Sequence, residues 1–114
     1  MLFRSDFDYV VMVLAMLGDK DVDGVLEELH RSADVFVVSE TLSARALPAD
    51  ELAEAAREWV DEDSVIVTSD INAALMKAID LANGVAAKSP GIVVTGSLYT
   101  VAEARLLLGK GEAP

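Results

Sequence analysis

Residues 9–17 read YVVMVLAML, a continuous apolar run that is rich in β-branched side chains and bounded by Asp8 and Gly18. A strand with one solvated face alternates apolar and polar residues, whereas a strand buried on both faces is apolar throughout. The run is also far shorter than the roughly 20 apolar residues that a membrane-spanning helix needs. It therefore predicts an interior strand of a parallel sheet that is covered by helices on both faces.

Outward from this strand, short apolar runs alternate with helical patterns in which apolar residues recur at three- and four-residue spacing. The inward-facing residues expected on the first three helices are Val22, Val25, Leu26 and Leu29, then Leu52, Ala55, Ala56, Trp59 and Val60, then Ile71, Ala74, Leu75, Ala78 and Ala82. Further strands are expected at residues 35–38, 65–67 and 91–95, and helices at about 21–31, 48–60, 70–84 and 100–108.

The order β-α-β-α-β-α-β-α predicts the α/β class, with a three-layer α/β/α architecture, a mostly parallel sheet and right-handed crossovers. We expect one domain over residues 9–108, with flexible segments at 1–8 and 109–114. Pro48 suits the start of a helix, and residues 83–84 (Asn-Gly) suit the end of one.

Composition excludes several classes of partner. Apolar residues make up 53% of the chain, which predicts a packed core. The net charge of −11 argues against binding to nucleic acid or to an anionic membrane. The chain has no cysteine, so a disulfide scaffold, a thiolate metal site and a cysteine nucleophile are excluded, and His30 is its one histidine. No signal peptide is recognisable, and we expect a cytoplasmic protein.

Ligands of open α/β sheets bind beyond the carboxyl ends of the strands. The loop at residues 18–21 brings Asp19, Lys20 and Asp21 to that edge, where a cation and two carboxylates could lie near a ligand, although an Asp also starts helices well. Arg45, in the loop at residues 39–48, could bind a phosphate or a carboxylate with two hydrogen bonds, or could be an ordinary surface arginine.

Gly96 and Ser97 follow the last expected strand and could cradle an anion with backbone N–H groups at a helix N-terminus, although tight turns need glycine in any case. Thr100 and Glu103 have the spacing of a capping box for that helix. His30 is expected near the end of a helix in a structural role, since no carboxylate or second histidine clusters with it in the sequence. The motifs of a P-loop, a dinucleotide-binding loop and a nucleophile elbow are all absent from the sequence. No catalytic residue and no metal ligand is assigned.

Three segments carry a family resemblance: VLAMLGDKDVDGVL at residues 13–26, SARALP at 43–48 and VVTGSLYTVAEAR at 93–105. Together, in this order, they resemble the C-terminal domain of the folylpolyglutamate synthase/dihydrofolate synthase family, whose fold is that of the Mur ligases. The resemblance covers roughly residues 9–108, and the first and third segments carry most of it.

The resemblance implies an amide ligase that uses ATP and Mg²⁺ to phosphorylate a folate carboxylate, after which the amino group of L-glutamate displaces the phosphate. It also implies a larger N-terminal domain with the P-loop, and an opening strand of the C-terminal domain that ends in an Asp-Gly-Ala-His-Asn-Pro-like motif. Neither motif occurs in these 114 residues. We therefore expect the chain alone to be inactive and to bind no cofactor tightly, with the N-terminal ligase domain as its partner.

In the family that opening strand should lie inside the sheet, so that its loss would leave backbone groups unpaired. Dimerisation, strand exchange or a rearranged strand order is expected as the result, although the acidic surface favours a monomer.

Two alternatives to a ligase domain remain open at this stage. A receiver-like regulatory domain would use Asp19 and Asp21 as its acidic pair and Asp70 as its phosphate acceptor, but a fifth strand that ends in lysine is missing from the pattern. A stand-alone protein-interaction domain derived from the ligase is the other.

Overall fold

Strands and helices alternate along the chain as the apolar pattern predicts, with one additional strand. The computed structural model describes residues 7–94 and 97–109. In chain order the elements are β1 (Tyr9–Leu14), α1 (Val22–Leu29), β2 (Val35–Val38), α2 (Ala49–Arg57), a 3-10 turn (Glu62–Ser64), β3 (Val65–Val67), α3 (Ile71–Gly84), β4 (Pro90–Val94), β5 (Ser97–Thr100) and α4 (Val101–Gly109).

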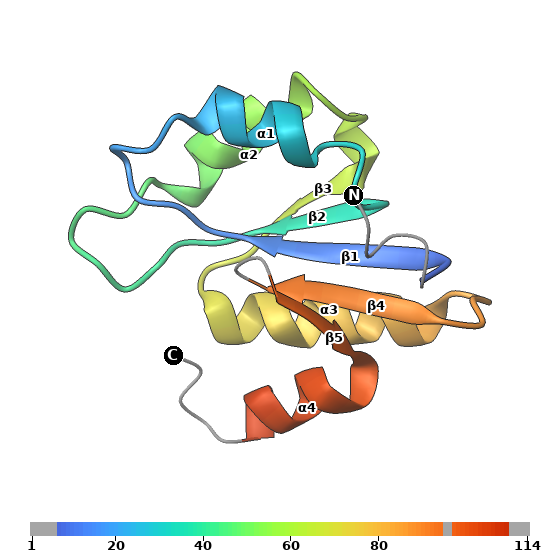
Figure 1. Ribbon diagram of the computed structural model, residues 1–114. Helices are drawn as coiled ribbons and strands as arrows, with labels where there is room; N and C mark the ends of the chain where they lie inside the picture. Colours follow the sequence, from blue (N-terminus) through green and yellow to red (C-terminus); the bar gives the residue numbers. More distant parts are fainter. Residues whose placement is uncertain (1–6, 95–96, 110–114) are drawn as a thin grey trace.

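The strands form one sheet in the order β3-β2-β1-β4-β5, with β1 in the middle (Figure 1). β1 runs parallel to both of its neighbours, so that Val11 lies opposite Val35 on one side and Ile92 on the other. Because β1 is covered on both faces as well, Val10 and Val11 are completely buried. The prediction of an interior parallel strand from the apolar run is confirmed.

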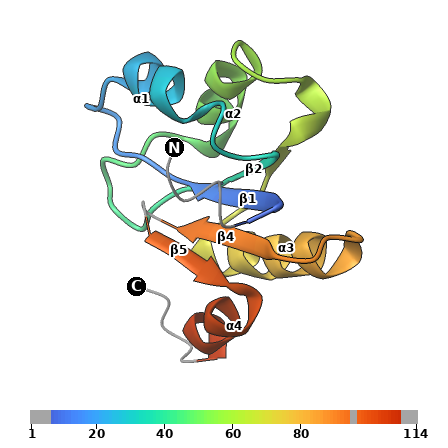
Figure 2. The same ribbon diagram turned by 45° about the vertical axis from the view of Figure 1, so that its right-hand side comes forward.

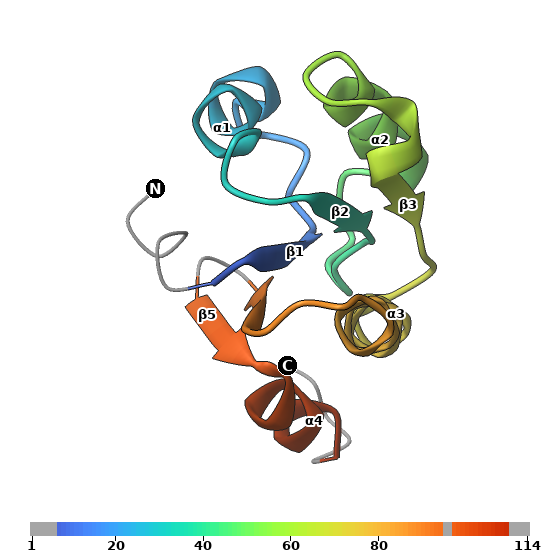
Figure 3. The ribbon, with the colours of Figure 1, turned by 90° about the vertical axis from the view of Figure 1, so that its right-hand side faces the viewer.

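Helices cover both faces of the sheet and complete the predicted three layers. Figure 3, a view turned by 90°, shows α1 and α2 on one face and α3 and α4 on the other. Successive side chains of a strand point to opposite faces, and β1 therefore supplies both cores. Val10, Met12 and Leu14 join the core under α1 and α2, whereas Val11 and Val13 join the core over α3 and α4.

The expected helix faces agree with this packing, and the element ends differ by a few residues. The inward-facing residues expected on α1, α2 and α3 all lie in one of the two cores or against it. β1 ends at Leu14 rather than at Leu17, because the chain leaves the sheet there for the loop before α1. Pro48 is the residue that precedes the first turn of α2, and not the first residue inside it.

The expectation that a helix directly follows the last parallel strand is wrong. Residues 97–100 form β5, which pairs antiparallel with β4 in the register Val94 to Ser97 and Gly91 to Thr100. β4 and β5 are therefore antiparallel neighbours, and Figure 2 shows β5 leading into α4. An aromatic and β-branched segment such as Leu-Tyr-Thr favours a strand over a loop. The fifth strand thus covers the edge that β4 would otherwise present.

The interior of the sheet has no vacant strand position. β1 exchanges backbone hydrogen bonds with β2 and with β4, which leaves β3 and β5 as the two edges of the described sheet. The expected unpaired interior position is therefore not found among the described strands, and dimerisation or strand exchange stays a prediction without that basis. Whether the strand order is rearranged relative to the family stays a prediction. No helix in residues 7–94 and 97–109 is both long and apolar enough to cross a membrane.

Candidate functional site at the carboxyl edge of the sheet

The loops that follow β1 and β2 are joined to each other at the carboxyl edge of the sheet. A short antiparallel bridge connects them. Its two backbone hydrogen bonds run from the Gly18 N–H to the Arg45 carbonyl oxygen at 2.9 Å and from the Leu47 N–H to the Met16 carbonyl oxygen at 2.9 Å. Residues 27 positions apart in the sequence, Gly18 and Arg45, are thereby fixed beside one another.

Side-chain oxygens shape the longer loop from within. The Ser43 N–H donates to Thr41 Oγ1 at 3.3 Å, and the Arg45 N–H donates to Ser43 Oγ at 3.0 Å. Hydroxyl groups of this kind favour turns because they offer the backbone a local partner. Glu40 caps α2 from the start of the loop, since its Oε1 accepts from the Ala49 N–H at 2.9 Å. The position of Arg45 is therefore set by backbone contacts on both sides.

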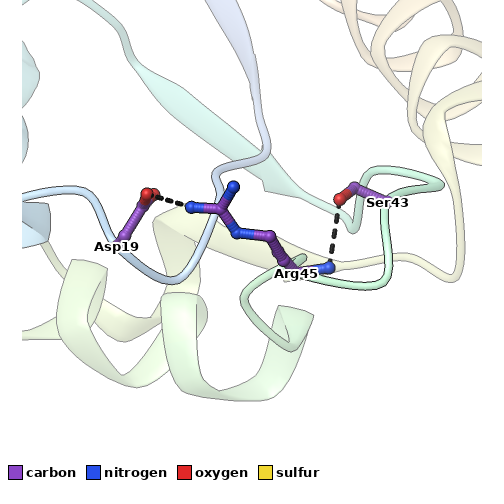
Figure 4. A network of polar contacts seen from close by, with 3 residues as sticks. All are labelled: Asp19, Ser43 and Arg45. Carbon is purple, nitrogen blue, oxygen red and sulfur yellow. Dashed lines mark hydrogen bonds and ion pairs between the residues drawn. The ribbon is translucent and has the colours of Figure 1, made fainter.

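Arg45 and Asp19 form an ion pair across the two loops. The Arg45 Nη2 donates to Asp19 Oδ2, as Figure 4 shows together with the Ser43 contact. The Arg45 side chain is 68% exposed and that of Asp19 is 55% exposed. Two of the residues that the sequence singled out separately are thus brought into direct contact, at a surface that a ligand can reach.

The two residues that follow Asp19 have different surroundings. The Asp21 carboxylate caps α1, with Oδ1 accepting from the Gly24 N–H at 3.1 Å. A Cβ built at Gly24 would lie 2.3 Å from Asp21 Oδ2, so a larger residue there would require the Asp21 carboxylate to shift. Asp21 is thus the N-cap of α1, and a role for it in ligand binding stays a prediction. Lys20 has an exposed side chain beside the ion pair, and its N–H donates to the Leu17 carbonyl oxygen at 3.3 Å.

The expected anion cradle after the last parallel strand has a different local structure. Gly96 lies outside the described residues, and Ser97 opens β5 opposite Val94, at the carboxyl edge. Because β5 runs back across the sheet, α4 starts near Gly91, at the other end of β4. The helix N-terminus that was expected beside Ser97 is therefore on the far side of the sheet. Ligand binding by Gly96 and Ser97 stays a prediction, but the helix N-terminus that was expected to contribute to it does not lie beside Ser97.

The loop after β3 is occupied by structural contacts. The N–H and the Oγ1–H of Thr68 both donate to the Val38 carbonyl oxygen, at 2.8 Å and 3.0 Å. Asp70 caps α3, since its Oδ1 accepts from the Ala73 N–H at 2.8 Å. A receiver-like domain would need Asp70 as a free acceptor and a parallel fifth strand, and neither condition is met here. The alternative of a receiver-like domain has no support in this structure.

His30 lies at the end of α1, as the sequence predicts. Its Nδ1 contacts the carbonyl oxygens of Leu26 at 3.1 Å and Glu27 at 2.9 Å, an arrangement that requires the Nδ1–H form to donate. Its ring centroid lies 5.1 Å from that of Trp59, two residues beyond the end of α2. α1 starts at the carboxyl edge and runs away from it, so His30 is remote from the ion pair. It links the end of α1 to the segment that follows α2.

Sequence reasoning missed two features of this edge. One is the pairing of Asp19 with Arg45, for which the only signal was opposite charge on two loops that follow adjacent strands. The other is Ser39, which is 0% exposed at the end of β2 and whose Oγ has no hydrogen-bond partner among the described residues. A single serine in a polar stretch carries no signal of burial. Within the described ranges, no three His, Asp or Glu residues converge to hold a metal ion.

Comparison with known protein families gives one match that covers most of the chain. The family described as "Mur ligase, glutamate ligase domain" matches residues 3–98. A dihydrofolate synthase/folylpolyglutamate synthase of Mycobacterium tuberculosis is 40% identical, over 92% of this chain and 23% of that protein. The chain thus spans about a quarter of the length of this relative.

Solved structures show the same relationship. A structure of the M. tuberculosis folylpolyglutamate synthase complexed with ADP superimposes with a TM-score of 0.78 at 41% identity, over 91% of this chain and 24% of that one. A bifunctional folylpolyglutamate synthase/dihydrofolate synthase from Yersinia pestis, complexed with AMPPNP and a manganese ion, gives a TM-score of 0.61 at 25% identity, over 90% and 22%. The fold described above is therefore shared with a domain-sized part of both enzymes.

Proposed function

The chain belongs to the Mur ligase family through its glutamate ligase domain, and from this premise we propose that it is that domain of an ATP-dependent ligase that adds L-glutamate to dihydropteroate or folates. The proposed whole enzyme phosphorylates a folate carboxylate with ATP, and the amino group of glutamate then displaces the phosphate to form the amide. Its proposed partner is an N-terminal ligase domain, and its proposed location is the cytoplasm.

The observation that carries the proposal is the joint position of the loops at residues 18–21 and 39–48. Both follow central parallel strands, both lie at the edge where α/β sheets bind ligands, and a backbone bridge holds them together. Arg45 and Lys20 are exposed cations at this edge of a chain whose net charge is −11. Lys20 and Arg45 can supply the positive charge that an anionic ligand such as a nucleotide phosphate or a glutamate carboxylate needs, although the carboxylates of Asp19 and Asp21 lie in the same loops.

The described residues fit a share in binding the nucleotide but do not form a metal site. The guanidinium of Arg45 offers two parallel N–H donors, a geometry that suits a phosphate or a carboxylate. Asp21 is occupied as a helix cap and Asp19 as the partner of Arg45. In our proposal this chain therefore binds and orients an anion at Arg45, with Lys20 beside it, while the P-loop and the ligands of Mg²⁺ belong to the proposed partner domain.

A domain exchange tests the proposal. The chain replaces the matching segment of the M. tuberculosis relative, and ADP formation that depends on both folate and glutamate is measured. We expect the chimera to be active and the isolated chain to form no ADP. In the chimera, Arg45→Gln should lower kcat/KM about tenfold or more, because a charged hydrogen bond contributes roughly 1.5–3 kcal/mol.

The matched control is Arg57→Gln, which removes the same charge from an exposed position in the last turn of α2. It should leave kcat/KM within about twofold, since exposed charges away from a ligand interact weakly. A chimera that folds and binds ADP but forms no product with any folate and glutamate would contradict the ligase proposal. Equal losses in the two arginine variants would contradict the role of Arg45 alone.

A further inference from the structure

We infer that Asp19 acts as an internal anion that holds Arg45 in the absence of ligand, and that an incoming carboxylate or phosphate takes its place on the guanidinium. This inference rests on the proposed function, because it assumes that Arg45 receives an anionic group. It adds a regulatory contact, because the guanidinium of Arg45 is already paired with the carboxylate of Asp19 before a ligand binds.

The backbone keeps the two side chains within reach of each other. The Gly18 N–H bonds to the Arg45 carbonyl oxygen at 2.9 Å, so the residue before Asp19 is fixed to Arg45 itself. Neither loop has to move for the ion pair to form, and no loop closure has to be overcome when it re-forms. Asp19 is therefore present at a high local concentration at all times, which makes it an effective competitor.

The ion pair is also weak enough to be displaced. Both side chains are more than half exposed, at 68% for Arg45 and 55% for Asp19. Exposed ion pairs of this kind contribute little to stability because water and salt screen them. A ligand group that engages the guanidinium with two parallel hydrogen bonds gains more than this single contact supplies. Displacement of Asp19 then favours anions that accept two hydrogen bonds from the guanidinium over small monovalent anions.

The neighbouring carboxylate does not share this role. Asp21 is held by the Gly24 N–H as the cap of α1, so its release would cost the helix its N-terminal partner. Asp19 has no such cap to maintain. Lys20 stands between the two with an exposed side chain, and it adds positive charge for a ligand once Asp19 has turned away.

The test is a titration of the ¹⁵N-labelled chain with ADP in one series and L-glutamate in another, followed by the amide shifts of residues 18–21 and 43–47. Asp19→Asn should tighten binding about two- to fivefold, the range that an exposed ion pair of up to about 1 kcal/mol permits. The matched control is Asp23→Asn, which removes the same charge from an exposed position in the first turn of α1. It should tighten binding by less than about 1.5-fold. Arg45→Gln should abolish the shifts.

Each outcome decides a separate point. Tighter binding in Asp19→Asn than in Asp23→Asn supports the exchange, and the series in which it occurs identifies the ligand as the nucleotide or the amino acid. Unchanged binding in Asp19→Asn would overturn the exchange, because Asp19 would then not compete with the ligand. Weaker binding would overturn it too, because Asp19 would then be part of the site, and either result leaves the proposed function standing. The absence of shifts at these amides with both probes, in the wild type and in Asp19→Asn, would overturn the exchange, while the ligase proposal would still be decided by the domain exchange described above.

Discussion

The phenyl ring of Phe7 lies directly over the α-carbon of Gly91, so close that a Cβ at Gly91 would come within 2.6 Å of Phe7 Cδ1 and 2.9 Å of Phe7 Cγ. Gly91 is a buried residue of β4, opposite Val10 of β1. Phe7 also packs against the core under α1 and α2. Phe7, two residues before β1, therefore packs against the central strands in the space that the missing side chain of Gly91 leaves open.

Gly91→Ala should destabilise the protein, because the added methyl group forces the Phe7 ring out of this seat. Overpacking of this kind costs roughly 1–3 kcal/mol. The change in the free energy of unfolding is measured by urea denaturation followed by circular dichroism. The double variant with Phe7→Leu should recover part of the loss, as coupled neighbours do.

The control for this prediction is Gly84→Ala at the end of α3, where a Cβ would meet no atom within 4 Å. Alanine favours a helix over glycine by about 1 kcal/mol at most, so this variant should be neutral or slightly more stable. A Gly91→Ala protein as stable as Gly84→Ala would show that Phe7 does not occupy the space over Gly91 in solution.

Asp8 makes the stability of the protein depend on pH in the acid range. Its carboxylate accepts from the Ser89 N–H at 2.9 Å and from the Lys88 N–H at 2.8 Å. These hydrogen bonds, that from Ser89 first, hold the pKa of Asp8 below its ordinary value of 3.8. A depressed pKa in the folded state stabilises the protein above the pKa of the unfolded chain, and this stabilisation is lost as the pH falls through the folded-state pKa.

Asp8→Asn should therefore lower the midpoint of urea unfolding at pH 7 relative to the wild type. The difference between the two midpoints should shrink at pH values below about 4. Asp80→Asn on the exposed face of α3 serves as the control, with a small difference that stays constant. A difference between Asp8→Asn and the wild type that is the same at pH 7 and pH 2.5 would exclude the ionised carboxylate as its cause.

Most of the fold could be predicted because its strongest signals are local. The run at residues 9–17 is apolar throughout, and such a run has few alternatives to an interior strand. The missed strand, β5, is four residues long and is the next element after β4 in the chain. Tyr99 of β5 packs against the core over α3 and α4, and it does so through the strand pairing that places it opposite Ile92 of β4. Pairing between strands is a tertiary contact, and the pattern of a four-residue segment does not reveal it.

The candidate site was predictable in its loops and not in its contacts. Asp19, Lys20, Asp21 and Arg45 do lie at the carboxyl edge, since the edge follows from the parallel order of β1 and β2. Which carboxylate meets Arg45 depends on the bridge between the loops, and that bridge uses backbone atoms that carry no sequence signature. The sequence left the cap and the ligand roles of Asp21 equally open, and only the Gly24 contact favours the cap.

The capping box of α4 is confirmed and gives a further prediction. The Glu103 N–H donates to Thr100 Oγ1 at 3.2 Å, and the Thr100 N–H donates to Glu103 Oε1 at 2.9 Å. Thr100→Ala should lower the free energy of unfolding by about 1 kcal/mol. Thr100→Ser should retain most of this stabilisation, because the serine hydroxyl also caps a helix. The measurement is chemical denaturation of the three proteins side by side. Equal losses for alanine and serine would show that the methyl group of Thr100 matters and the cap does not.

Trp59 joins α2 to α1 through its ring rather than through its N–H group. It packs against the core and lies 5.1 Å from the ring of His30, yet its buried Nε1 has no hydrogen-bond partner within the described part of the chain. Trp59→Phe keeps an aromatic ring and removes an unsatisfied donor, so we expect a loss below about 1.5 kcal/mol. Trp59→Ala should cost about 2–3 kcal/mol, less than the roughly 3–5 kcal/mol typical of a fully buried tryptophan, because this side chain is half-buried. Unfolding followed by circular dichroism, which needs no tryptophan, measures both. A Phe variant as unstable as the Ala variant would mean that Nε1 does have a partner in solution, and a bound water would be the first to look for.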